Sequence, residues 1–146
     1  MSEHYAYIVL EAEKWWNRRC NQKNAGKVFQ AFVRGGKVGP LSADLLFFYI
    51  KHPVREFRGT AEFVERIAGN ADELWDKYAS ETVFESYGEY KEFLESRENT
   101  TFIRFKNLQE LTHTITGKSF LEKIGGGSML PRNGRYLSKE LMSVLV

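Results

Sequence analysis

The stretch LLFFYIKHPVREFRGTAEFVERI, residues 45–67, decides the fold of this chain. Its first six residues are apolar and rich in aromatic rings, which is typical of a strand that is buried on both faces. Beyond the turn segment KHPVR the residues alternate, so we expect Phe57, Gly59, Ala61 and Phe63 on one face of a second strand. The proline of that segment cannot donate a hydrogen bond to a strand ladder and therefore indicates a turn. The stretch predicts a long hairpin on which the rest of the chain packs.

Positive charge gathers at the turn of this hairpin. Lys51, His52 and Arg55 lie in the turn segment, and Arg58 is near the start of the return strand. Loops of this kind supply many of the phosphate contacts in nucleic-acid complexes. Each of these side chains could equally be a solvated turn residue, so the pattern alone leaves both interpretations open.

The composition is that of one ordinary globular domain. The chain has 146 residues, of which 42% are hydrophobic and 27% are charged, and this length is enough for a sizeable core. The single cysteine, Cys20, excludes an internal disulfide and indicates a reducing compartment. No apolar run approaches the ~20 residues of a membrane helix, and the first residues lack the pattern of a signal peptide. We therefore expect a cytoplasmic protein that does not enter a membrane.

Charge is distributed unevenly along the chain. Residues 70–99 contain nine acidic and three basic residues, so that the other residues carry a net charge of +8 although the whole chain carries only +2. A basic body suggests an anionic partner, although mildly basic proteins without such a partner are also common. We expect a single domain, 1–146, with residues 70–99 as an acidic helical elaboration. Residues 80–98 should be peripheral, and their deletion should leave the protein folded.

The other segments predict short elements that interleave along the chain. Asn70 and Ser86, each followed three residues later by Glu, predict the starts of two short helices. The further predictions are strands at 5–10, 28–33 and 101–105, with 108–111 a candidate for another, and helices at 11–22, 120–124 and after Ser138. Because the strand pairings look antiparallel and the helices are short, we expect an α+β fold. Its sheet should be mixed or barrel-like, with helices at its outside and ends.

The sequence offers little support for metal or cofactor chemistry. His4, His52 and His113 lie in three separate segments without ligand spacing, and Cys20 has no partner. A nucleophile elbow and a dinucleotide fingerprint are both absent. We therefore expect neither a metal nor a cofactor. General acid–base chemistry would need a carboxylate in a cleft, and Glu62 on the central hairpin is the one candidate.

Basic residues next to aromatic ones at turns favour a nucleic-acid-binding surface. The candidate binding residues are Arg34 and Lys37 of the glycine loop RGGKVGP, Lys51, His52, Arg55 and Arg58 of the hairpin, and Arg132, Arg135 and Tyr136 of the C-terminal loop. Trp15 and Trp16 are candidates for stacking on a base, although a place in the core is the simpler interpretation for both. No strict nucleic-acid motif accompanies these residues.

The hairpin resembles the central hairpin of the PUA-like superfamily, and most closely that of its ASCH and EVE branches. The ending SMLPRNGRYLSKELMSVL is similar to the tail of a small archaeal group of the same kind. The resemblance implies a small pseudo-barrel surrounded by short helices that binds RNA or a modified nucleobase. If so, the hairpin turn and the C-terminal loop should lie near one another.

Some ASCH proteins are amidohydrolases that act on acetylated cytidine through a lysine, a threonine and a glutamate. In this chain Lys27 of AGKVF matches the lysine of that branch and Glu62 matches the glutamate by position, but the threonine is missing and Phe29 replaces a polar residue. Three functions therefore stay open. The first is a non-enzymatic module for RNA or a modified nucleobase, the second is a small amidohydrolase using Lys27 and Glu62, and the third is a protein-interaction domain using the acidic segment.

Overall fold

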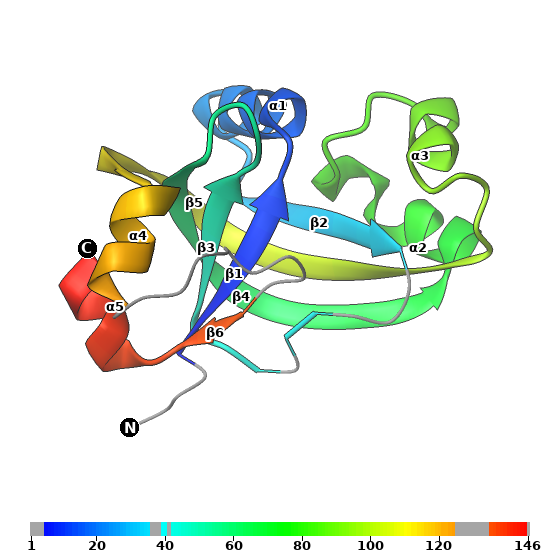
Figure 1. Cartoon of the computed structure of the whole chain (residues 1–146). Helices are drawn as coiled ribbons and strands as arrows, with labels where there is room; N and C mark the ends of the chain where they lie inside the picture. The colour runs from blue at the N-terminus through cyan, green and yellow to red at the C-terminus, as the bar shows by residue number, and fades with distance from the viewer. Residues whose placement is uncertain (1–4, 36–38, 41, 125–134, 146) are drawn as a thin grey trace.

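The computed structural model describes residues 5–35, 39–40, 42–124 and 135–145. In this part of the chain a strongly curved six-stranded sheet has the strand order β2-β5-β4-β3-β1-β6, with helices around it (Figure 1). The elements in chain order are β1 (Ala6–Glu11), α1 (Glu13–Asn24), β2 (Phe29–Gly35), β3 (Leu45–Ile50), β4 (Glu56–Asn70), α2 (Ala71–Tyr78), the 3-10 turn η1 (Ala79–Glu81), α3 (Tyr87–Phe93), β5 (Asn99–Thr116), α4 (Gly117–Lys123), β6 (Tyr136–Leu137) and α5 (Lys139–Leu145). The predicted α+β class and mixed sheet are confirmed, and the sheet does not close into a barrel.

The hairpin predicted from residues 45–67 is present as β3 and β4, which pair antiparallel. β5 pairs antiparallel with both β4 and β2. The prediction of uniformly antiparallel pairing is wrong for β1 and β3, which run parallel from Ala6↔Leu45 to Glu11↔Ile50. The two short strands considered at 101–105 and 108–111 are parts of one long strand, β5.

A bulge in β4 overturns the predicted alternation of its first residues. Tyr49 pairs with Phe57, but Phe48 pairs with Gly59, so that Arg58 is the additional residue. An extra residue moves all later side chains to the other face of the strand. Phe57 therefore lies on the opposite face from Gly59 and Ala61, whereas the sequence pattern placed all three together.

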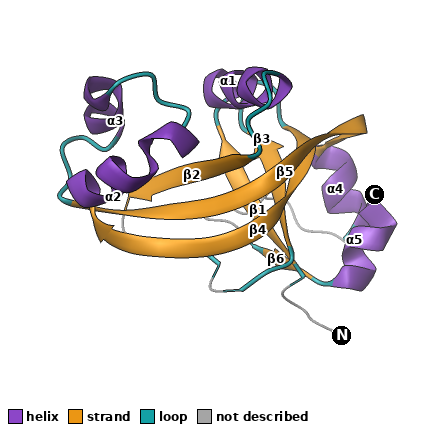
Figure 2. Ribbon diagram, turned by 180° about the vertical axis from the view of Figure 1, so that it is seen from behind, coloured by secondary structure: helices purple, strands orange, loops and turns teal. Residues whose placement is uncertain are grey.

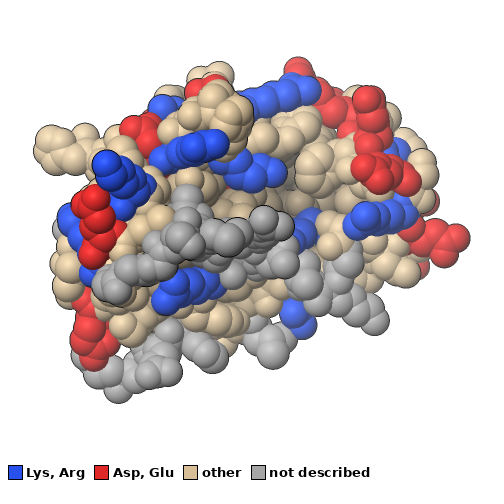
Figure 3. Space-filling view, viewed as in Figure 1, with Lys and Arg blue, Asp and Glu red and all other residues tan. Residues whose placement is uncertain are grey.

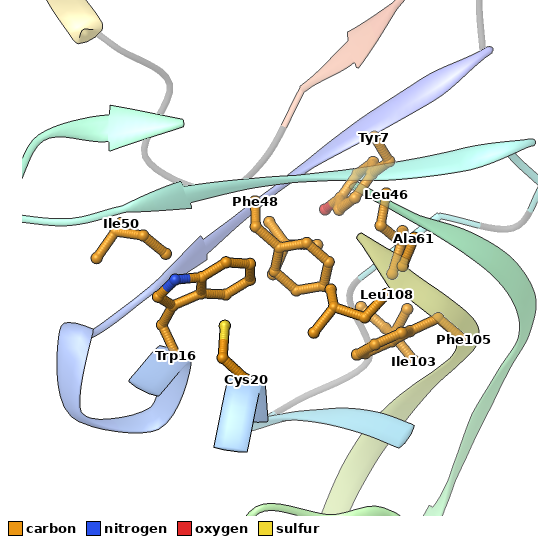
Figure 4. Close-up of a cluster of buried hydrophobic side chains, with 11 residues drawn as sticks. Tyr7, Trp16, Cys20, Leu46, Phe48, Ile50, Ala61, Ile103, Phe105 and Leu108 are labelled. Carbon is orange, nitrogen blue, oxygen red and sulfur yellow. The ribbon is translucent and has the colours of Figure 1, made fainter. Parts of the chain in front are cut away.

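The inner face of the curved sheet encloses the first apolar cluster. Side chains from β1, β3, β4 and β5 meet here, and α1 covers them with Trp16 and Cys20 (Figure 4). Trp16 packs against Phe48, with 5.4 Å between the ring centroids. The apolar stripe of α1 packs on this cluster, and this packing fixes the position of the helix over the inner face of the sheet.

Two further clusters cover the outer face of the sheet. At one end, α4 and α5 bury Phe47 and Phe57, whose rings stack with centroids 4.2 Å apart (Figure 2). At the other end, α2, α3 and the segment between them pack on β2 and β5. The helix starts predicted at Asn70 and Ser86 are confirmed, since each side chain accepts hydrogen bonds from backbone N–H groups of the following turn.

The expectation that residues 80–98 are peripheral is wrong. Tyr90 is fully buried and donates a hydrogen bond of 2.7 Å to the carbonyl oxygen of Ala71. Phe84 and Leu94 are also buried, and together with Tyr90 they cover Phe102 of β5. The acidic residues face outward, but the apolar side chains between them form part of the core. No helix among the described residues is long and apolar enough to cross a membrane.

Candidate functional site

The two edges of the curved sheet face each other across a gap, and several polar side chains of the inner face lie there. β2 forms one edge, while β1 and the short strand β6 form the other. The pairings make β1 antiparallel to β2, so the end of β2 lies opposite the start of β1. We call this gap the seam. It is defined by Tyr7, Glu11, Arg19, Gln30, Phe32, Arg34, Arg66 and Tyr136.

A buried ion pair bridges the seam at the end of β1. The Arg19 guanidinium donates to both carboxylate oxygens of Glu11, at 3.0 Å and 2.6 Å, and both side chains are almost fully buried. Arg19 also donates to the side-chain oxygen of Gln30 at 3.1 Å and to the carbonyl oxygen of Ala31 at 3.3 Å. A buried charge is tolerated when it is paired and hydrogen-bonded in this way. Arg19 thus joins α1, β1 and β2, and among the residues that the structure describes no backbone ladder connects the two edges.

A small cavity of about 80 Å³ lies beside this ion pair. Its walls include four aromatic rings and its polar lining includes Glu11, Arg19 and Lys51. The rings belong to Trp15, Phe32, Phe84 and Phe93. Aromatic walls with a few fixed polar groups are the usual lining of a site for a flat organic ring.

Two tyrosines and two arginines meet at the other end of the seam. The rings of Tyr7 and Tyr136 pack edge to face with their centroids 5.2 Å apart. Arg34 is hydrogen-bonded to Tyr7, and Arg66 is close enough for its charge to act on the same phenol. Burial raises the pKa of Tyr7, while the positive charges of Arg34 and Arg66 oppose that rise. Tyr7 is therefore a neutral phenol at physiological pH.

A third register shift between β4 and β5 places Arg66 in the seam. The register shifts between Phe63 and Glu65, after which Arg66 lies opposite Ile103, a residue of the inner cluster. Its Nη1 donates to the carbonyl oxygen of Gly39 at 3.4 Å, and it forms no salt bridge with a described residue. A guanidinium offers five donors in a planar fork, and this geometry suits a phosphate or a carboxylate.

The predicted binding residues are only partly brought together. Arg34 and Tyr136 lie in the seam, and Lys51 lines the cavity beside it. Arg135 is exposed, and its carbonyl oxygen accepts a hydrogen bond of 2.8 Å from the N–H of Ile8. Lys37 and Arg132 lie outside the described residues.

The hairpin turn and the C-terminal strand lie at opposite ends of β1, so the expected convergence is wrong for the described residues. The N–H of Lys51 donates to the carbonyl oxygen of Glu11, whereas Tyr136 pairs with Tyr7. Four residues of strand separate these points, which is about 13 Å. His52 and Arg55 are exposed at the turn and thus lie away from the two tyrosines.

Arg58 and the two tryptophans have structural surroundings. Arg58 donates to Glu56 at 3.0 Å and 3.1 Å, so its charge is already balanced within the domain. Trp16 is 2% exposed and cannot stack on a ligand. Trp15 is half-buried, and its ring packs edge to face with the rings of Phe84 and Phe93. Part of Trp15 also lines the small cavity.

The residues considered for amidohydrolase chemistry do not contact each other. The Lys27 ammonium donates to the side chain of Gln22 and to the carbonyl oxygen of Thr82, each at 3.0 Å. Burial and, to a smaller extent, the nearby charge of Arg19 lower the pKa of Lys27 to about 8, while the charge of Glu81 opposes this shift. Glu62 is exposed and accepts a hydrogen bond from Asn107. The carboxylate that acts on Lys27 is thus Glu81 and not Glu62.

Several residues of the seam were not predicted as site residues from the sequence. Tyr7 and Glu11 occupy alternate positions of β1 that face inward with Val9, and a carboxylate at such a position signals a buried polar contact. Arg66 was not predicted because the bulges of β4 change which residues of the strand face inward. No group of three or more His, Cys, Asp or Glu residues within the described ranges is arranged to hold a metal ion.

Comparison with known proteins shows a common fold. The chain superposes on the crystal structure of ASCH from Zymomonas mobilis with a TM-score of 0.73 and 21% sequence identity, covering 97% of this chain and 94% of that one. A serine-to-alanine variant of the same protein gives a TM-score of 0.75 with 20% identity, over 98% of this chain and 95% of that one. No family model matches the sequence, and no curated protein matches it.

These matches confirm the predicted resemblance at the level of the fold. The class of protein that the structure defines is an α+β domain with the fold of the ASCH protein from Zymomonas mobilis. A tyrosine-to-phenylalanine variant of the Zymomonas mobilis ASCH protein superposes equally well, with a TM-score of 0.71 and 20% identity over 94% of each chain.

Proposed function

We propose that this protein binds single-stranded RNA in the seam. The observation that carries the proposal is the meeting of Arg34 and Arg66 with the Tyr7–Tyr136 pair at the open edge of the sheet. Guanidinium groups suit phosphates, and the partly exposed ring of Tyr136, which packs against the buried ring of Tyr7, suits the face of a base. The four side chains thus combine both kinds of contact that a protein uses on single strands.

The cavity beside the ion pair extends this site along β2. Phe32 lines the cavity, and Arg34 follows two residues later on the same face of the strand, about 7 Å away. A nucleotide with its phosphate on the arginines can therefore direct its base, or that of its neighbour, towards the aromatic walls.

The acidic segment gives less support to a protein-interaction function. Acidic side chains gather over α2 and α3, on the right in Figure 3. Several of them bind cations of the domain itself: Glu85 and Glu89 bind Arg18, and Glu81 binds Arg104. These acidic groups hold the segment against α1 and β5.

The hydrolase alternative also has less support, because Lys27 and Glu62, the pair on which it depended, bind different partners.

The test is a salt titration of binding to a short single-stranded RNA, measured by fluorescence anisotropy. Arg34→Gln and Arg66→Gln should each weaken binding and reduce the slope of log K against log[salt] by about 0.7, because each variant loses one phosphate contact. Tyr136→Ala should weaken binding by about 1–3 kcal/mol with little change in slope, because stacking is not ionic.

The matched control is Arg55→Gln, which removes an exposed arginine from the hairpin turn. Its affinity and slope should equal those of the wild type. Circular dichroism and a melting curve verify that each variant is folded. A loss of slope in Arg55→Gln, with no loss in Arg34→Gln and Arg66→Gln, would move the binding surface to the turn and refute the seam as the site.

A further inference from the structure

A cavity of about 920 Å³ lies on the opposite side of the sheet from the seam. It opens between the last part of β5 and the helices α4 and α5. We call it the outer cavity. Successive residues of β3 separate the two sites, because Leu45 lines the outer cavity while Leu46 faces the inner cluster. A ligand in the outer cavity therefore contacts none of the residues that define the seam.

The floor of the outer cavity is apolar. Leu45, Ile115, Met142 and Leu145 line it and belong to the cluster beneath α4 and α5. Leu111 adds a further half-buried side chain in the irregular stretch of β5 between Glu110 and Ile115, where the register with β4 shifts. An apolar floor of this kind favours a hydrocarbon chain, because burial of each CH₂ group contributes about 0.8 kcal/mol.

The rim of the outer cavity is positively charged. Lys123 of α4 and Lys139 of α5 both line it, and neither forms a salt bridge with any residue that the structure describes. The carboxylate in the lining belongs to Glu110, which is bound by Lys23 at 2.8 Å. Hydroxyl groups of threonine and serine residues supply further hydrogen-bond partners around the opening.

We propose that the outer cavity binds a single-chain amphiphile with an anionic head group. The chain lies over Leu45, Met142 and Leu145, and the head group lies between Lys123 and Lys139. The two ammonium groups then gain a counter-charge next to an apolar surface, where an ion pair is screened less than in open solvent. The volume of about 920 Å³ is within the range of sites for organic molecules of this size.

Decanoate is the probe, used below the concentration at which it forms micelles, and isothermal titration calorimetry gives its affinity. 1-Decanol and decyltrimethylammonium carry the same chain with no charge and with a positive charge. Decanoate should bind at least about tenfold more tightly than either, since a charged hydrogen-bonded contact contributes about 1.5–3 kcal/mol.

Two variants test the place of binding. Lys123→Glu combined with Lys139→Glu should lower the affinity for decanoate at least about tenfold by the same charge argument. Ser143→Trp puts a bulky ring into the cavity from an exposed position of α5 and should abolish binding while the protein stays folded. The matched controls are Lys118→Glu and Val144→Trp, which change exposed neighbours outside the lining and should leave the affinity unchanged.

Equal binding of decanoate and decanol would overturn the anionic preference, and wild-type affinity in Ser143→Trp would overturn the site. If decanoate does not bind at all, the proposal of an amphiphile site is overturned. RNA binding is independent of this outcome, so the same variants should retain the RNA affinity of the wild type.

Discussion

Gly59 illustrates how one residue of the hairpin depends on a distant one. A Cβ atom at this position would overlap the ring of Trp16 and lie 2.8 Å from the carbonyl oxygen of Gln109. Trp16 is 2% exposed and packs against Phe48, so a shift of its ring would disturb the inner cluster. A side chain at this position would therefore collide with α1, which covers the hairpin.

Gly59→Val should lower the free energy of unfolding by at least about 1–3 kcal/mol, because overpacking of a filled core forces side chains and backbone to shift. Urea denaturation measures the change. Gly69→Ala is the matched control, since a Cβ there meets no atom within 4 Å. Its stability should equal or slightly exceed that of the wild type. Equal midpoints for Gly59→Val and the wild type would contradict the packing described for Trp16.

At the scale of elements, the segment between β4 and β5 completes the core. Its helices α2 and α3 begin at the predicted caps, and its charges face outward as their positions in the sequence suggest. What the pattern did not show is where the apolar side chains go. Val83, Phe84, Tyr90 and Leu94 cover the outer face of β2 and β5, a surface that the rest of the chain leaves open.

Replacement of residues 80–98 by a short Gly/Ser linker should abolish cooperative unfolding, because it exposes Phe102 and Val33 to water. Tyr90→Ala should cost about 3–5 kcal/mol, as large-to-small changes of buried aromatic residues do. The control Tyr87→Ala, at a residue that is 46% exposed, should cost no more than about 1 kcal/mol. A deletion variant that melts as sharply as the wild type would show that the segment is dispensable.

At the scale of the whole molecule, the sheet is curved but its edges are joined by side chains instead of a ladder. Arg19 makes this connection through Glu11 of β1 and Gln30 of β2, and its guanidinium also lies 5.2 Å from the centroid of the Phe105 ring. This arrangement keeps the seam open enough to hold polar side chains. A continuous ladder would close the same gap with backbone.

Arg19→Met should destabilise the protein by about 3–5 kcal/mol, because it leaves the Glu11 carboxylate buried without a partner. The double variant Arg19→Met with Glu11→Leu should recover much of that loss, since it removes both buried charges. Chemical denaturation of the two single variants and the double variant gives the coupling energy. Strictly additive changes would mean that the two side chains do not stabilise each other across the seam.

Periodicity and caps determined most of the elements of this protein. The apolar run of β3, the proline of the turn and the helix starts at Asn70 and Ser86 act over a few residues, so the sequence alone places them correctly. The resemblance of the hairpin to PUA-like proteins also led to the right fold. Two of the predicted binding residues, Arg34 and Tyr136, lie in the site for the same reason: both are in loops or strand ends that return to the edges of the sheet.

Only the tertiary structure decided which side chains share a site. The bulges of β4 reverse the faces of its residues, and their positions depend on pairing with β5, whose partner residues at these bulges lie 39 to 58 residues away along the chain. The curvature of the sheet then brings Glu11, Arg19 and Gln30 together and separates the hairpin turn from Tyr136. Register and curvature arise from the packing of the whole domain, and no local pattern of residues specifies them.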